Sequence, residues 1–147
     1  MVSVAAATTS TRVDAWLYAR LDGGAAHVPS CAGRRYPDDT APQDVIYPYV
    51  HYTLLSGVEV LAVEGAPVMS DLVYLVEAIA KTGTWATVQG PSDEIHAALH
   101  QQRGSTPGAD GLILSSICEE QIRRAELVEG TRYRYLGWRV RIHAEAA

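Results

Sequence analysis

Residues 131–143 read TRYRYLGWRVRIH, and they carry the clearest structural signal in the chain. From residue 135 onward polar or small side chains alternate with apolar ones, which are Leu136, Trp138, Val140 and Ile142. A period of two is typical of a β-strand with one face on the core and the other in solvent. Residues 112–118 and 120–128 are also strand-like, and Glu129-Gly130 forms a turn, so the sequence predicts a C-terminal β-hairpin.

The N-terminal part begins with a helix. Thr11 to Asp14 resemble a capping box, and apolar residues then recur at spacings of three and four. This pattern predicts an amphipathic helix that Gly23-Gly24 ends. The Gly-, Pro- and Asp-rich residues 25–44 read as an ordered connector.

The middle of the chain mixes strand and helix signals. Aromatic and β-branched residues predict strands over 45–55, with Pro48 at the start or on an edge, and over 58–63. Residues 71–81 fit either a helix or a strand, and periodicity alone does not decide between them. Ser92 is the predicted N-cap of a second, short helix that ends at Gly104.

Helices and strands are therefore segregated rather than alternating along the chain. This order predicts an α+β fold in which two helices pack on a mainly antiparallel sheet. The length of 147 residues favours one domain, with residues 1–9 as a flexible N-terminus and 101–111 as a loop insertion.

Composition limits the function classes. The chain is 48% hydrophobic, which suits a folded core, and no window is long and apolar enough to span a bilayer. Residues 1–7 lack a basic segment, so no signal peptide is expected. The net charge of −5 argues against tight binding of duplex DNA, although six of the arginines lie between Arg123 and Arg141.

Catalytic and metal-binding patterns are weak. His96 and His100 have a spacing that suits a shared metal ion, but His-Glu-x-x-His is not met and no third ligand is obvious nearby. Cys31 and Cys118 read as ordinary reduced thiols, and no nucleophile elbow or phosphate-binding glycine loop occurs. We therefore expect no catalytic residues, no cofactor and no metal, and a protein that is not an enzyme.

A resemblance to a known family rests on the connector and the first strand. Arg35-Tyr36-Pro37, then small and acidic residues, then Tyr47-Pro48-Tyr49-Val50 and Tyr52 resemble the tail-terminator or tail-completion proteins of long-tailed phages. The order of elements is similar to that family over residues 10–143.

The resemblance implies a structural virion protein that forms a homohexameric ring at the head-proximal end of the tail tube. The ring would terminate tail polymerisation and join the tail to the head. Its implied partners are further copies of itself, the major tail tube protein and the head-side connector or stopper protein, with no membrane. DNA would pass through the pore without specific binding.

The implied location is the neck region of the virion tail, after assembly in the bacterial host cytoplasm. The resemblance also makes residues 71–80 a strand. The alternatives are another neck or head-completion adaptor of the same fold, a small enzyme, or a nucleic-acid-binding module.

Candidate interface residues come from two groups. Tyr47 and Tyr52 combine apolar area with a hydroxyl and suit either an interface or the core. The C-terminal arginines suit a solvated strand face, a protein interface or, less readily, nucleic acid, and they are Arg132, Arg134, Arg139 and Arg141.

Overall fold

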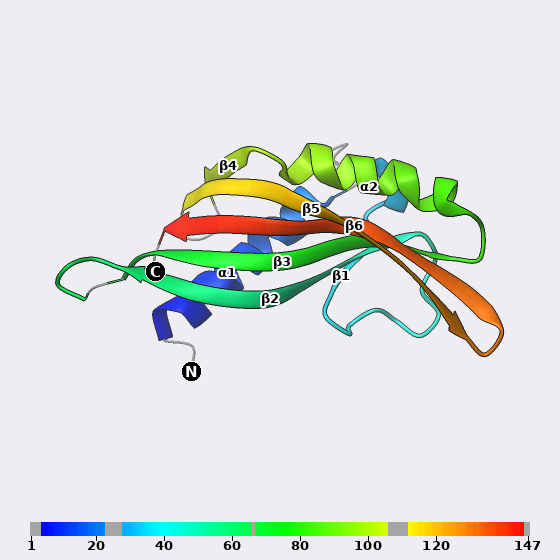
Figure 1. Cartoon of the computed structure of the whole chain (residues 1–147), viewed down its shortest axis with the longest axis horizontal. Helices are drawn as coiled ribbons and strands as arrows, with labels where there is room; N and C mark the ends of the chain where they lie inside the picture. Colours follow the sequence, from blue (N-terminus) through cyan, green and yellow to red (C-terminus); the bar gives the residue numbers. More distant parts are fainter. Residues whose placement is uncertain (1–3, 23–27, 66, 106–111, 146–147) are drawn as a thin grey trace.

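One long, twisted six-stranded sheet organises the molecule (Figure 1). The computed structural model describes residues 4–22, 28–65, 67–105 and 112–145. The helices are α1 (Val4–Arg20), the short 3-10 helix η1 (Pro29–Cys31) and α2 (Trp85–Leu99). The strands are β1 (Arg35–Pro37), β2 (Tyr49–Leu61), β3 (Pro67–Lys81), β4 (Gln102–Ser105), β5 (Leu112–Val128) and β6 (Thr131–Glu145), in the spatial order β1-β2-β3-β6-β5-β4.

The expectation of a mainly antiparallel sheet is wrong, because the sheet is mixed. β1 runs parallel to β2, with Arg35 opposite Val50 and Pro37 opposite Tyr52. The chain leaves β1, loops back, and enters β2 in the same direction, and the Arg34 guanidinium closes this loop on the carbonyl oxygen of Pro48 at 3.0 and 3.1 Å. Three residues inside a connector are too few to show a strand period, whereas the α+β class agrees with the structure.

β3 is a strand, which answers the ambiguity of residues 71–81. It is the third strand of the sheet and is buried on both faces. Leu72, Tyr74 and Val76 face the helices, whereas Val73 and Ile79 are buried on the opposite face. Consecutive apolar positions of this kind mimic the spacing of a helix, so the pattern was ambiguous.

Two strands are longer than expected because each continues through an irregularity. β2 joins the predicted strands 45–55 and 58–63, and its register shifts between Leu54 and Ser56. β5 joins 112–118 and 120–128, and its register shifts between Cys118 and Glu120. Each break in the predicted pattern therefore marks a bulge, at which the side chains change faces.

Helix α2 starts seven residues before the predicted N-cap Ser92. Thr84 is the N-cap, and it forms a capping box with Thr87. Gly90-Pro91 lies inside the helix, and Ser92 is buried there. The Gly-Pro pair indicated a helix start, but the buried contacts of Val88 and Pro91 outweigh the hydrogen bond that proline cannot donate.

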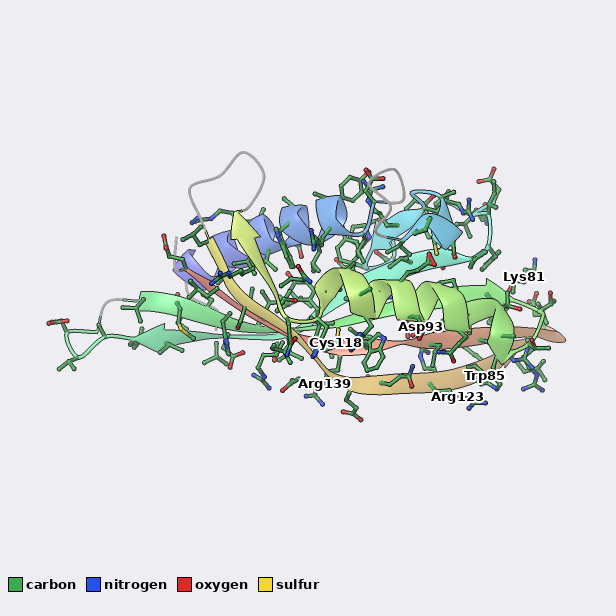
Figure 2. All side chains as sticks on the ribbon, turned by 90° about the horizontal axis from the view of Figure 1, so that it is seen from above. Lys81, Trp85, Asp93, Cys118, Arg123 and Arg139 are labelled. Carbon is green, nitrogen blue, oxygen red and sulfur yellow. The ribbon has the colours of Figure 1, made fainter. Side chains whose placement is uncertain are left out.

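Both helices cover the same face of the sheet (Figure 2). The apolar residues of β3 and β6 form one cluster with residues of both helices and with Leu21, which follows α1. The helical residues include Val13 and Leu17 of α1 and Val88, Ile95 and Leu99 of α2. Trp138 is partly buried against this cluster and donates its indole N–H to the carbonyl oxygen of Ser92 at 3.1 Å. Within the described part of the chain, no helix is long and apolar enough to cross a membrane.

The expected loop at 101–111 is only partly described. Gln102–Ser105 form β4, which pairs with the start of β5, and residues 106–111 lie outside the described residues. Of the expected flexible N-terminus, residues 4–9 belong to α1 and residues 1–3 lie outside the described residues.

Gly137 supports a first testable prediction. A β-carbon at this position would overlap the carbonyl oxygen of Val76 and the α-carbon of Glu77, both backbone atoms of β3. We expect Gly137→Ala to lower the free energy of unfolding by about 3 kcal/mol or more, because the two strands would have to separate. Urea unfolding measures this loss.

Gly90→Ala is the matched control. Its β-carbon would meet no atom outside its own helix closer than the Ser30 hydroxyl at 3.9 Å, and alanine favours a helix by roughly 1 kcal/mol. This variant should be as stable as the wild type or more stable. Equal stability of the two variants would show that β3 and β6 are not held this closely.

Candidate assembly surfaces

The face of the sheet opposite the helices carries an acid–arginine cluster, formed by Asp71, Glu119, Glu120, Arg139 and Arg141. One Arg141 nitrogen, Nη1, contacts both carboxylate oxygens of Asp71 at 2.8 Å, and Nε donates to Glu119 at 3.1 Å. Arg139 lies 3.8 Å from Glu120. These contacts raise the pKa of Arg141, chiefly through the hydrogen bond to Asp71.

The bulge in β5 builds this cluster. Glu119 is the extra residue, because Cys118 pairs with Val140 and Glu120 pairs with Arg139. Two consecutive carboxylates thereby reach arginines on one face, where a regular strand would send them to opposite faces. Arg139 and Arg141 lie away from the core, as the alternation predicted, but carboxylates of the same chain already balance them.

The four C-terminal arginines do not form one patch. Arg132 and Arg134 lie on alternate positions from Arg139 and Arg141, so they belong to the other face. Arg134 donates to the carbonyl oxygen of Gly83 at 2.6 Å. The Arg134 guanidinium lies 5.7 Å from the centroid of the Trp85 ring. The guanidinium of Arg123 lies 3.9 Å from the same centroid (Figure 2).

The two candidate tyrosines, Tyr47 and Tyr52, also lie in different environments. Tyr52 is only 2% exposed and packs in the core, which favours the core alternative for this residue. Tyr47 is half-buried, and its ring centroid lies 5.4 Å from that of Tyr49 and 6.0 Å from that of Tyr133. This aromatic group covers one end of the sheet face that the helices leave open.

A buried carboxylate beside the aromatic group was not anticipated. Glu77 is fully buried in β3, and its Oε1 lies 2.9 Å from Arg124 and 3.5 Å from His51 Nδ1. Burial alone raises the pKa of Glu77, but the hydrogen bonds and charges of His51 and Arg124 outweigh it and leave the pKa lowered. A charged residue inside the apolar run 72–80 was the available sequence signal.

His51 responds in the opposite direction. The nearby Glu77 carboxylate raises the pKa of His51 above its ordinary 6.5, although burial opposes the shift. Arg124 completes the arrangement, because its guanidinium stacks 3.8 Å from the ring centroid of Tyr135. We call Glu77, His51, Arg124 and Tyr135 the Glu77 group. Its contacts connect β2, β3, β5 and β6, and its geometry is that of a structural ion pair.

Several exposed apolar side chains of the described residues gather on the hairpin of β2 and β3. We call residues 54–65 and 67–68 the apolar arm. Its exposed apolar side chains are 39% to 104% accessible, and they are Leu54, Leu55, Val58, Val60, Leu61, Val63 and Val68. Among the described residues, β3 pairs with β6 as far as Met69, so the pair Leu61 and Pro67 and the turn that follows Leu61 project past the end of β6 (Figure 1). A large exposed apolar patch on a folded domain marks an interaction surface.

The arm also presents a strand edge. Among the described residues, β1 pairs with β2 only at Val50 to Tyr52, so the backbone of residues 53–61 has no strand on that side. Open apolar edges pair readily with other chains. Residues 58–63 were predicted as a strand. Their apolar side chains at neighbouring positions were the signal in the sequence that could have indicated an exposed apolar surface here.

A second, smaller apolar tip lies at the turn between β5 and β6. Leu127 and Val128 are exposed there, at the end of the sheet away from the arm (Figure 1). The two hairpins give the molecule two different apolar ends. In a closed ring of identical subunits, one surface of each subunit contacts a different surface of the next subunit.

Comparisons with known proteins identify a fold. No protein-family model and no curated protein match the chain. A chain of the solved structure described as "Virion of native gene transfer agent (GTA) particle" has a TM-score of 0.60 at 17% identity, covering 96% of this chain and 99% of that chain. The likeness therefore extends over nearly the whole length of both chains.

The Glu77 group predicts a pH dependence of stability. Since folding raises the pKa of His51, its contribution is fully present below 6.5 and is lost as pH rises through the folded value. Folding lowers the pKa of Glu77, so its contribution is present above 4.5 and is lost as pH falls. The ion pair stabilises most between these two values.

His51→Gln tests this prediction. Between about pH 6 and about pH 9 the wild type should lose more unfolding free energy than His51→Gln, because only the wild type loses the imidazolium. Urea unfolding at each pH gives the difference, in which the titration of the other histidines cancels. An equal change of unfolding free energy with pH in the two proteins would show that His51 does not contribute to the ion pair.

Proposed function

We propose that this protein is a structural subunit of a phage-like virion, which forms the ring that terminates the tail tube and joins it to the head. The observation that carries the proposal is the fold likeness to a virion chain over nearly the full length of both chains. The resemblance of residues 35–52 to tail-terminator proteins supports the position at the end of the tube. We further propose that the protein has no enzymatic activity.

Self-association in this proposal uses the apolar arm. An arm that packs on a neighbouring subunit would remove apolar side chains from water, and each fully buried valine or leucine is worth roughly 1.5–3 kcal/mol. The arm and the tip at Leu127 are different surfaces at opposite ends of the sheet, so contacts between unlike patches close a homohexamer. Arg132, Arg134, Arg139, Arg141 and Tyr47 stay predicted contact residues.

The remaining partners follow from the position in the particle. One side of the ring would meet the major tail tube protein, and the other would meet the head-side connector or stopper protein. The net charge of −5 suits a pore through which DNA moves, since acidic walls repel phosphate. The protein would reside in the neck of the virion after assembly in the bacterial cytoplasm.

Deletion of the gene tests the proposed function directly. Without a terminator, tube subunits continue to add, so we expect overlong tubes that are detached from DNA-filled heads in electron micrographs. Tubes of normal length beside unjoined heads would indicate another neck or head-completion adaptor. Intact particles would contradict a structural role, and tight, salt-sensitive binding of duplex DNA by the purified protein would favour a nucleic-acid module.

Substitution in the arm tests how the ring forms. Leu55→Glu combined with Val58→Glu places charges on exposed positions, so the subunit should stay folded to within about 1 kcal/mol and lose its ability to form rings. Sedimentation over a concentration series, with tube ends present and absent, measures assembly. Ile46→Glu, also exposed but outside the arm, should assemble normally, and rings in the arm variant would exclude the arm from the interface.

A further inference from the structure

Three side chains with metal-binding atoms meet at the C-terminal end of α2. His96 and His100 lie one helical turn apart, and Cys118 comes from β5. Their ligand atoms all lie within 4.8 Å of one another. Figure 2 shows Cys118 beside this end of the helix. We propose that these residues bind one transition-metal ion, and that Zn²⁺ is the ion that suits the donor set.

The fold supplies the third ligand that the sequence did not show. Cys118 pairs with the core residue Val140, so its side chain points to the helix-covered side of the sheet. It is the last residue before the bulge at Glu119, and the register shift begins immediately after it. Cys118 follows His100 by 18 positions, with β4 between them, and no local spacing motif links the two.

Both imidazoles are held in place beside the thiol. The rings of His96 and His100 stack with centroids 4.5 Å apart and planes 22° apart, and Trp138 packs 4.6 Å from His96. The backbone N–H of Cys118 donates to His100 Nδ1 at 3.1 Å. This bond keeps Nδ1 free of a proton but occupies its lone pair, so an ion that binds at Nδ1 must replace the N–H as the partner of a neutral imidazole.

The surroundings suit a cation. The carbonyl groups at the end of α2 carry partial negative charge, which stabilises positive charge nearby. Both histidines are half-buried and Cys118 is buried, so an ion can enter from the solvent side and reach the sulfur. Two nitrogens and one sulfur resemble zinc sites that have three protein ligands and keep a fourth, open position for water.

Binding requires modest closure and the loss of one proton. Bonds of about 2.1 Å to nitrogen and about 2.3 Å to sulfur place tetrahedral donors roughly 3.5 Å apart. Rotation of the side chains about their χ angles can bring the ligand atoms this close, and the ion then takes the place of the N–H at His100. The Cys118 thiol must lose its proton to bind the ion as a thiolate, so the affinity for the metal should rise with pH.

A bound ion would fasten α2 to β5. The hydrogen bond from the Cys118 backbone to His100, the C-cap of α2, already joins the two elements here. The ion would stabilise the folded subunit in proportion to the logarithm of its concentration, since the unfolded chain does not hold the three ligands together. This inference concerns the subunit itself and is independent of the proposed role in the tail.

Titration of the tag-free, metal-stripped protein with Co²⁺ tests the site. We expect one equivalent to bind and to produce both thiolate-to-cobalt charge-transfer absorption and the visible bands of a tetrahedral ion. Zn²⁺ should abolish both signals and raise the melting temperature. The charge-transfer band reports the sulfur ligand in the wild type itself, so the test does not depend on whether a variant folds.

Matched cysteines provide the control. Cys31 is a second buried, unpaired thiol whose pKa is raised to about 12 by burial, and it lies outside the cluster. Cys118→Ser should lose the charge-transfer band and weaken Co²⁺ binding by more than about tenfold, whereas Cys31→Ser should retain both. His96→Asn should also weaken binding. Failure of Co²⁺ to bind, binding without the thiolate band, or a band that survives in Cys118→Ser would overturn the proposal.

Discussion

Glu77 and Gly137 face each other across the centre of the sheet, and the rest of the structure depends on how closely these two positions approach. Gly137 has no side chain to separate β6 from β3. The space that it leaves lets the Glu77 carboxylate stay buried and still reach His51 on the neighbouring strand β2 and, across β6, Arg124 on β5. A buried charge without these partners would cost several kcal/mol. The close spacing of β3 and β6 and the pairing of the Glu77 charge therefore depend on each other.

β3 therefore has two roles that are usually separate. Toward the helices it presents Leu72, Tyr74 and Val76 to a conventional apolar core. Toward the open face it carries Asp71 and Glu77, which organise the arginines of β5 and β6. Because these layers share one backbone, the twist that suits the helices also determines where the charged face lies.

The sequence predicted the elements with regular periods and missed the features that depend on contacts distant in sequence. The alternation of residues 135–143 correctly placed Leu136, Val140 and Ile142 in the core, and Arg139 and Arg141 away from it. It did not show that Glu119 is an extra residue, because a bulge is defined by its partner strand. β1 was missed for the same reason, since three residues become a strand only beside β2. Likewise, Cys118 approaches His96 and His100 only after the sheet has formed.

The apolar arm has a consequence for the life of the subunit before assembly. A free subunit carries an open strand edge and apolar side chains that water solvates poorly, so its solubility falls as its concentration rises. Under the proposed function, production in step with the receiving structure would keep unassembled copies from associating nonspecifically. In the proposed assembly role, a surface that suits permanent burial would make the unassembled protein a short-lived intermediate.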